Sequence, residues 1–388
     1  MSVTRLDFHP LTFVEERDGI TVGRSDTQSY ALLPPDGVVL LRCLVEGMPL
    51  SDAADWYRAT FGEPVDMADF VATLHDLGFV KVDGEESPDP PRVRFQSLGR
   101  AAFSSVAWLC YAGVSVGCLL AMAAHPQLRP HAQNIFFSPS LVVVQIVLAL
   151  AQLPALLWHE WFHVLAARRL GLPSRLGIGR RLYFVVFETE LNGLLGVSRR
   201  QRYLPFLAGM LADVLLFGGL TLAAAVDLNN GFSWVGRLCL ALAYTVLLRL
   251  AWQFYVFLRT DLYYVFTTVL GCTNLHEVTS AYLRDRFDWL PGVRPSRVDE
   301  ASWSPRDKQI APWFALLTVV GVGILLSTAL FMIAPMVLEF TVRMGSALAR
   351  GTAAGALFWD SAVSLLMVTL ELVVLPLLVG RRRDRTTT

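Results

Sequence analysis

Long apolar runs occupy most of the chain from about residue 104 onward. Six of them reach roughly 20 residues, which is the length a helix needs to cross the hydrocarbon core of a bilayer. The pattern therefore predicts a mainly α-helical, polytopic membrane protein of about six transmembrane helices. The predicted spans are 104–124, 138–167, 204–226, 235–258, 312–336 and 355–379.

The first 98 residues follow a different pattern and end in the proline- and acid-rich linker VDGEESPDPPRVR. The pattern of apolar and polar residues in 18–33 predicts a short β-hairpin. Three later stretches have the apolar spacing of amphipathic helices. We expect Ser51 and Asp66 to cap the second and third helices. The sequence thus predicts a small winged-helix-like α+β domain with its linker at 1–98 and a transmembrane domain at 99–388. The three helical stretches are 34–48, 49–62 and 65–82.

Composition supports the membrane class and excludes several others. The chain is 54% hydrophobic and 17% charged, whereas about a quarter of the residues in soluble domains are charged. The formal net charge is zero, so no basic field indicates nucleic acid as a partner. The five cysteines contain no CxxC pair, which excludes a disulfide framework and a cysteine zinc site. The N-terminus lacks the apolar segment of a secretory signal peptide.

Arginine is distributed unevenly among the predicted loops. The connection from 168 to 202, the segment 259–311 and the C-terminal tail are rich in arginine, whereas the other three loops hold only Arg129, Arg343 and Arg350. Cytoplasmic loops carry the excess of positive charge. We therefore expect a multi-pass protein of the cell membrane whose N-terminus and C-terminus are both cytoplasmic.

The second predicted span contains a candidate metal site in LLWHEWFHVLAARR, residues 156–169. His159 and His163 are four residues apart, so on a helix they share a face and can bind one metal ion, with Glu160 placed to act on water. The alternative is a hydrophobic helix that carries two histidines by chance. Ionisable residues inside a bilayer are costly, and this favours a functional site.

A catalytic zinc ion usually has three protein ligands, and Asp261 at the cytoplasmic end of the fourth span is the best third candidate. Its alternative role is an interfacial carboxylate paired with Arg259. Asp213 and Arg249 are expected to form a buried ion pair, and His276 is expected to be solvated. Asp360 and Glu371 are further charges within the last span, without an expected role.

Residues 181–200, RLYFVVFETELNGLLGVSRR, combine a β-favouring run with an Asn-Gly pair at Asn192–Gly193. This pattern predicts a hairpin at the membrane surface with its turn at that pair. An exposed strand beside the candidate metal site could bind an extended peptide by strand addition. The alternative is a connecting hairpin with no contact to substrate.

Three segments of the membrane domain resemble the site-2 protease family of intramembrane metalloproteases, and within it the peptide zinc metalloprotease branch. They are HEWFH at 159–163, RRQRYLPFLAGMLAD at 199–213 and LRTDLYYVFTTVLGCTNL at 258–275. The resemblance covers about 138–285, the core of the domain. It implies a zinc metalloendopeptidase in which His159, His163 and Asp261 bind Zn²⁺ and Glu160 is catalytic.

The N-terminal stretches LLRCLVEGMPLSDAADWY and DFVATLHDLGFV resemble PqqD-like domains, which recognise the leader peptides of ribosomally made, modified peptides. The resemblance covers about 15–82 and implies that a leader peptide adds a strand to the edge of the hairpin. The alternative is a regulatory or purely structural cytoplasmic domain.

Together the two resemblances predict a membrane-embedded zinc endopeptidase that removes the leader from a ribosomally synthesised modified peptide. Its partners would be a peptide or protein substrate and the lipid bilayer, and no nucleic acid. One alternative is a signalling intramembrane protease that cuts a transmembrane regulator such as an anti-sigma factor. Another is a catalytically silent membrane protein that binds a peptide or confers immunity.

Overall fold

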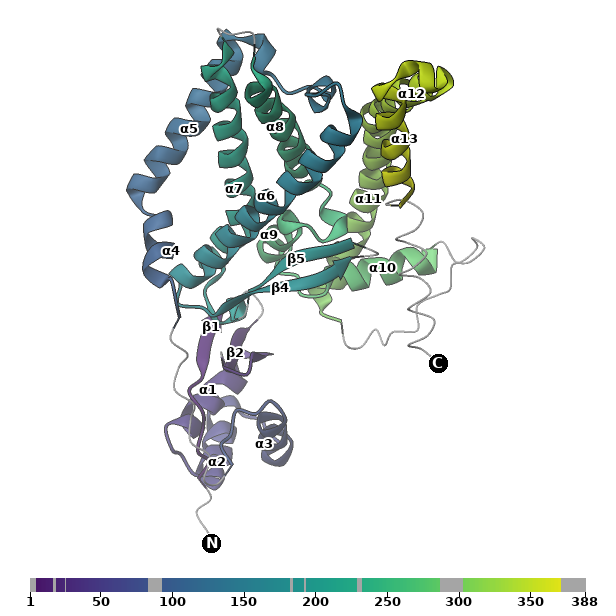
Figure 1. Ribbon diagram of the computed structural model, residues 1–388. Coiled ribbons are helices and arrows are strands. Elements are labelled where there is room, and N and C mark those ends of the chain that lie inside the picture. The colour runs from purple at the N-terminus through teal and green to yellow at the C-terminus, as the bar shows by residue number, and fades with distance from the viewer. Residues whose placement is uncertain are drawn as a thin grey trace. The chain divides into compact units, whose positions relative to one another are not determined.

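The computed structural model describes residues 5–16, 19–24, 26–82, 93–181, 184–191, 193–228, 232–286 and 303–370. The described chain is mainly helical (Figure 1). It divides into two compact units, of which the first contains residues 1–100, 164–175 and 190–205 and the second contains the rest. The N-terminal segment of the first unit therefore ends two residues beyond the predicted domain boundary at 98.

A three-stranded antiparallel sheet, in the order β1-β2-β3, begins the first unit. The predicted hairpin is present, with Ile20 paired to Leu33 and Arg24 paired to Ser29. The additional strand pairs with the other side of the hairpin, and the sequence did not predict it because four residues are too short for a periodic signal. The strands are β1 (Thr12–Glu15), β2 (Ile20–Arg24) and β3 (Ser29–Leu33).

Three helices follow the sheet at the predicted positions, and their apolar faces close a core around Leu40, Leu74 and Phe79. Asp66 caps the third helix as predicted, because its carboxylate accepts from the backbone N–H groups of the second and third residues after it, at 3.0 and 3.1 Å. The Ser51 cap was wrong. Pro49 occupies the cap position, since proline's fixed φ suits a helix start. The helices are α1 (Pro35–Val45), α2 (Leu50–Phe61) and α3 (Met67–Asp76).

Within the first unit, the sheet also packs against a short turn from much later in the chain, η3 (Leu194–Gly196). A Cβ added at Gly196 would lie 3.1 Å from the hydroxyl of Tyr30, so the close approach favours glycine here. Glu16 forms ion pairs with Arg199 and Arg202. Two arginines of the arginine-rich connection therefore hold the N-terminal sheet.

The second unit contains helices that match the first five predicted spans. Among the described residues, five helices are long and apolar enough to cross a membrane, by length and composition. Only 6% to 33% of their most apolar windows is buried within the protein, as expected for helices that face lipid. These five are α5 (Ser105–Ala124), α6 (Leu141–Arg169), α7 (Arg199–Val226), α8 (Trp234–Trp252) and the helix Pro305–Phe331, which contains α11 (Pro305–Thr328).

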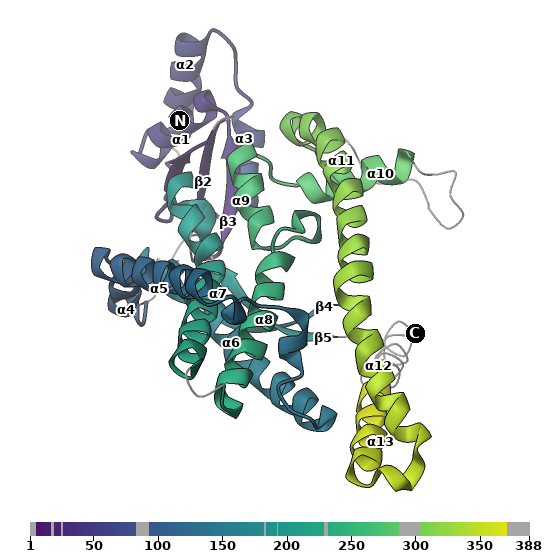
Figure 2. The ribbon, with the colours of Figure 1, turned by 90° about the horizontal axis from the view of Figure 1, so that it is seen from above.

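The C-terminal part differs from the prediction. The predicted loop at 337–354 is largely helical, because α12 (Ala334–Ala349) continues from α11 through a π-helical segment, Ala329–Ile333 (Figure 2). The predicted sixth span is represented by a shorter apolar helix, α13 (Ala356–Thr369). The remainder of that span, including Glu371, lies outside the described residues.

The fourth span ends at Trp252, six residues before the predicted end. The chain then turns through η5 (Val256–Leu258) and Arg259, which adopts a left-handed φ of 58°. A new helix, α9 (Asp261–Leu270), starts directly after this turn and is followed by α10 (Leu275–Arg286). The break therefore places Asp261 at the first position of a helix.

The predicted hairpin between the second and third spans is present but shifted. Strands β4 (Ser174–Arg181) and β5 (Phe184–Leu191) form a two-stranded sheet. The connection lies between them and not at Asn192–Gly193, so the predicted turn was wrong. Asn192 lies outside the described residues, and Gly193, with a φ of 82°, leads into η3. The other described helices are α4 (Gln96–Ala102), η1 (Pro126–Leu128), η2 (Ala132–Ile135) and η8 (Gly351–Ala354).

Candidate metal centre

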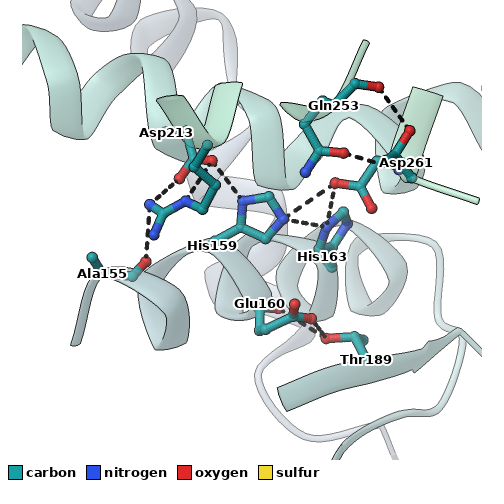
Figure 3. A network of polar contacts seen from close by, with 10 residues as sticks. Ala155, His159, Glu160, His163, Thr189, Asp213, Gln253 and Asp261 are labelled. Carbon is teal, nitrogen blue, oxygen red and sulfur yellow. Dashed lines mark hydrogen bonds and ion pairs between the residues drawn. The ribbon is translucent and has the colours of Figure 1, made fainter. Parts of the chain in front are cut away.

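Two histidines of α6 and one aspartate of α9 meet inside the second unit (Figure 3). His159 and His163 share a face of the helix, are 4% and 5% exposed, and have their Nε2 atoms 3.2 Å apart. The Oδ2 atom of Asp261 lies 3.2 Å from Nε2 of His159 and 3.3 Å from Nε2 of His163. These three residues could hold a metal ion. Asp261 thus faces the histidines, which decides against its alternative role as a partner of Arg259.

Each of the three atoms can serve as a ligand, because a carboxylate oxygen accepts and an imidazole Nε2 accepts when the hydrogen of a neutral ring is on Nδ1. Nδ1 of His159 lies 2.9 Å from a carboxylate oxygen of Asp213, and a carboxylate only accepts, so this ring nitrogen carries the hydrogen. When the ring is neutral, this arrangement turns the lone pair of Nε2 toward Asp261. The Oδ2 atom of Asp261 is buried and has no hydrogen-bond partner in the part of the chain that the structure describes. Lone pairs on these three atoms would repel one another unless a positive charge, such as a metal ion, lay between them.

Gly209 on helix α7 lies close to the two histidine rings of this cluster. A Cβ at this position would lie 2.3 Å from Nε2 of His159 and 2.3 Å from Nε2 of His163. Real Cβ atoms do not approach that closely, so a side chain here would occupy the space in front of both ligand atoms. Glycine therefore keeps the centre open. Gly209 falls in a segment that carried the family resemblance, but spacing within the sequence gives no sign of this contact.

Asp213 and Arg249 form a hydrogen-bonded pair that holds the ring of His159. Asp213 on α7 accepts from His159 and from Arg249 on α8, whose Nε and Nη2 atoms lie 3.0 and 2.5 Å from its two carboxylate oxygens. The predicted ion pair between Asp213 and Arg249 is confirmed. Its contact with His159 was not predicted, because the sequence does not specify how α7 and α6 face each other.

Glu160 lies next to the ligand group, on a different side of α6 (Figure 3). Its side chain is buried, and its Oε2 atom accepts a hydrogen bond of 2.8 Å from the hydroxyl of Thr189 on β5. The carboxylate is thereby fixed in orientation without being used as one of the three clustered ligands. Sequence analysis did not identify Thr189, whose partner lies 29 residues away.

Asp261 is oriented by the chain break that precedes it. Its backbone N–H donates to Oε1 of Gln253, at 3.1 Å, and the hydroxyl of Thr260 donates to the backbone carbonyl of Gln253, at 2.7 Å. Gln253 and Thr260 are both buried. The end of α8 therefore fixes the start of α9, which positions the carboxylate.

His276 and Cys272 are not part of the group of three ligand candidates. His276 is half-buried and not solvated as expected, since its ring packs edge-on against Tyr263 with centroids 6.3 Å apart. Burial and the charge of Arg259 lower the pKa of His276. Burial and the nearby Asp307 carboxylate raise the pKa of the Cys272 thiol to about 12, so this cysteine stays protonated near neutral pH.

Asp360 on α13 has a role that was not predicted. Its carboxylate accepts from the backbone N–H groups of Leu141 and Val142, at 2.8 and 3.3 Å, and from the hydroxyl of Ser140. These are the first unpaired donors of α6, where a negative charge is favourable. Asp360 therefore caps the helix that carries the two histidines and is not a ligand.

No protein-family model, no curated protein and no solved structure matches this chain. The site-2 protease and PqqD-like resemblances therefore remain predictions.

Proposed function

We propose that the chain is a membrane-embedded zinc endopeptidase. The observation that carries the proposal is the spacing of the three ligand atoms. Zinc ligands at about 2.0–2.1 Å with tetrahedral angles lie about 3.3–3.4 Å from one another, and the separations here are 3.2, 3.2 and 3.3 Å. Two imidazoles and a carboxylate are also a common ligand set of hydrolytic zinc sites.

The residues around the centre have distinct roles in this proposal. His159, His163 and Asp261 would hold the zinc ion, which when bound supplies a Lewis acid for the scissile carbonyl and the attacking water. Glu160 would accept the proton of the water and deliver it to the leaving amine. The hydroxyl of Thr189 donates to Glu160, which fixes the orientation of the carboxylate that would act as the base.

The apolar surroundings suit this chemistry. Both histidines lie on α6, and Gly209 lies on α7, two of the five helices with the length and composition of membrane spans. Electrostatic interactions are stronger in such a medium than in water. The arginine-rich connection between these helices supports an orientation in the cell membrane with the N-terminus and C-terminus in the cytoplasm.

The substrate in this proposal is the precursor of a ribosomally synthesised modified peptide. Among the described residues, β3 pairs with β2 on one side only, so a winged-helix-like N-terminal domain offers an edge to which a leader peptide could add a strand. Glu16, next to β1, pairs with two arginines at the start of α7. A leader held by this domain would be present at high effective concentration for a site in the same chain.

The test is cleavage by the purified full-length protein in detergent. Zinc-loaded protein is incubated with a library of precursor-like peptides, and the products are sequenced by mass spectrometry. We expect cuts that disappear when zinc is removed by a chelator and return when zinc is added. Absence of zinc-dependent cleavage across the library would contradict the proposal. Cuts confined to hydrophobic transmembrane peptides would favour a signalling protease.

The close approach of Gly209 to the two histidine rings gives a further prediction. We expect Gly209→Ala to weaken zinc binding about 5- to 150-fold, since overpacking costs about 1–3 kcal/mol and the new methyl group would fall on the two ligand rings. The measurement is zinc affinity by competition with a chelating dye. Gly219→Ala is the matched control on the same helix, because a Cβ there meets nothing within 4 Å. Equal zinc affinity in both variants would show that Gly209 does not shape the centre.

A further inference from the structure

Asp213 is an unusual residue for a membrane-spanning helix. Its side chain is 0% exposed, and both of its carboxylate oxygens are engaged. Burying a carboxylate carries a desolvation penalty of several kcal/mol, which a partner must offset. Arg249 is the charged partner, but the ion pair alone does not account for the third participant, His159 (Figure 3).

The contact with His159 determines which ring nitrogen is free. Oδ2 of Asp213 accepts from Nδ1 of His159 at 2.9 Å. This hydrogen bond fixes the tautomer in which Nε2 carries the lone pair, and it fixes the rotation of the ring. In that orientation Nε2 faces Nε2 of His163 and the Asp261 carboxylate. Without the acceptor, either nitrogen of the ring could carry the hydrogen.

Arg249 holds the acceptor in place. Two of its nitrogens bind the two oxygens of Asp213, and Nη2 also lies 3.5 Å from the carbonyl oxygen of Ala155. Ala155 is one helical turn before His159 on α6. The arginine therefore connects the helices that carry Asp213 and His159, and it neutralises the buried carboxylate.

We infer that Asp213, held by Arg249, is a positioning residue for the metal centre, which fixes the tautomer and orientation of His159 for zinc binding. The inference rests on the proposed zinc site and not on peptide cleavage. Outer partners of this kind change metal affinity by about 10- to 100-fold when removed. The competing explanation is that the Asp213–Arg249 pair only joins α7 to α8.

The experiment compares zinc affinities of full-length protein in detergent, with no substrate present. Asp213→Leu keeps a similar volume and removes the acceptor, and we expect zinc binding about 10- to 100-fold weaker than in the wild type. Asp360→Leu is the matched control, because Asp360 is also a carboxylate that contacts α6 but touches no ligand. We expect this control to bind zinc as the wild type does.

A second variant separates positioning from folding. Asp213→Leu leaves Arg249 as an uncompensated buried charge, whereas Asp213→Leu combined with Arg249→Leu removes the whole pair, a change that is often neutral for stability. If the pair only joins helices, the double variant regains wild-type zinc affinity. If Asp213 positions His159, the double variant folds, as judged by its helical circular dichroism. Its zinc affinity then remains about 10- to 100-fold lower than that of the wild type.

The possible results are distinguishable. Wild-type zinc affinity in Asp213→Leu, or recovery of affinity in the double variant, would overturn the inference and leave the proposed peptidase intact. Zinc binding that depends on Asp213 without any peptide cleavage would overturn the proposed function alone. A wild-type protein that binds no zinc would overturn both.

Discussion

Glu160→Gln will abolish peptide cleavage and leave zinc bound. Glutamine keeps the size of the side chain and can still accept from Thr189, which donates to Oε2 of Glu160, so the structure around the centre should persist. The amide cannot take up a proton from water, and loss of a general acid–base typically lowers kcat by about 10²–10⁴-fold. The measurement is kcat on a peptide that the wild type cleaves, together with zinc content by elemental analysis.

Glu339→Gln is the control for this change. Glu339 is half-buried and pairs with Arg343 one turn along the same helix, outside the candidate centre, so we expect unchanged kcat and unchanged zinc content. Wild-type cleavage by the Glu160→Gln variant would show that another group is the base. Loss of zinc from that variant would mean that Glu160 is needed to hold the metal.

His159→Ala and His163→Ala will each remove zinc from the protein. Each change deletes one of three ligands and leaves the Asp261 carboxylate facing a single imidazole. Because loss of an outer partner alone weakens metal binding about 10- to 100-fold, we expect loss of a ligand to exceed that range. The variants should emerge from dialysis against metal-free buffer without zinc, and they should lack cleavage activity.

His131→Ala is the matched control for the histidine variants. His131 is exposed and contacts the backbone carbonyl of Arg129, outside the centre. We expect this control to retain zinc and activity. If either ligand variant kept its zinc through dialysis as His131→Ala does, the assignment of the metal centre would be wrong.

The long apolar helices could be predicted from the sequence because the length of an apolar run is a strong signal. A span needs about 20 apolar residues, and this signal identified α5, α6, α7, α8 and α11 with small errors at the ends. Turns and caps were less predictable. Ser51 and Asn192–Gly193 have favourable residue types, but Pro49 starts the helix that contains Ser51, and β5 continues to Leu191.

The metal centre was predictable where its residues share one helix or one recognisable segment. Helical spacing predicted His159, Glu160 and His163 as site residues. Asp261 was predicted from its position at the cytoplasmic end of the fourth span and from the site-2 protease resemblance. Gly209, Asp213 and Thr189 act through contacts between different elements. Such contacts depend on how α6, α7 and β5 face each other, and local spacing carries no information about that arrangement.

The N-terminal unit illustrates the same limit. Its hairpin and three helices followed from apolar periodicity. The ion pairs of Glu16 with Arg199 and Arg202 did not, because these residues are more than 180 positions apart. In the sequence, those arginines indicated only membrane orientation. In the structure, they also hold the sheet that would bind a leader peptide in the proposed function.

The most direct test of the central claim is the metal content of the purified full-length protein, measured by elemental analysis after expression in metal-replete medium. The zinc endopeptidase proposal predicts one zinc ion per chain in the wild type and in Glu160→Gln, and none in His159→Ala or His163→Ala. A wild-type protein that contains no zinc under these conditions would contradict the proposal.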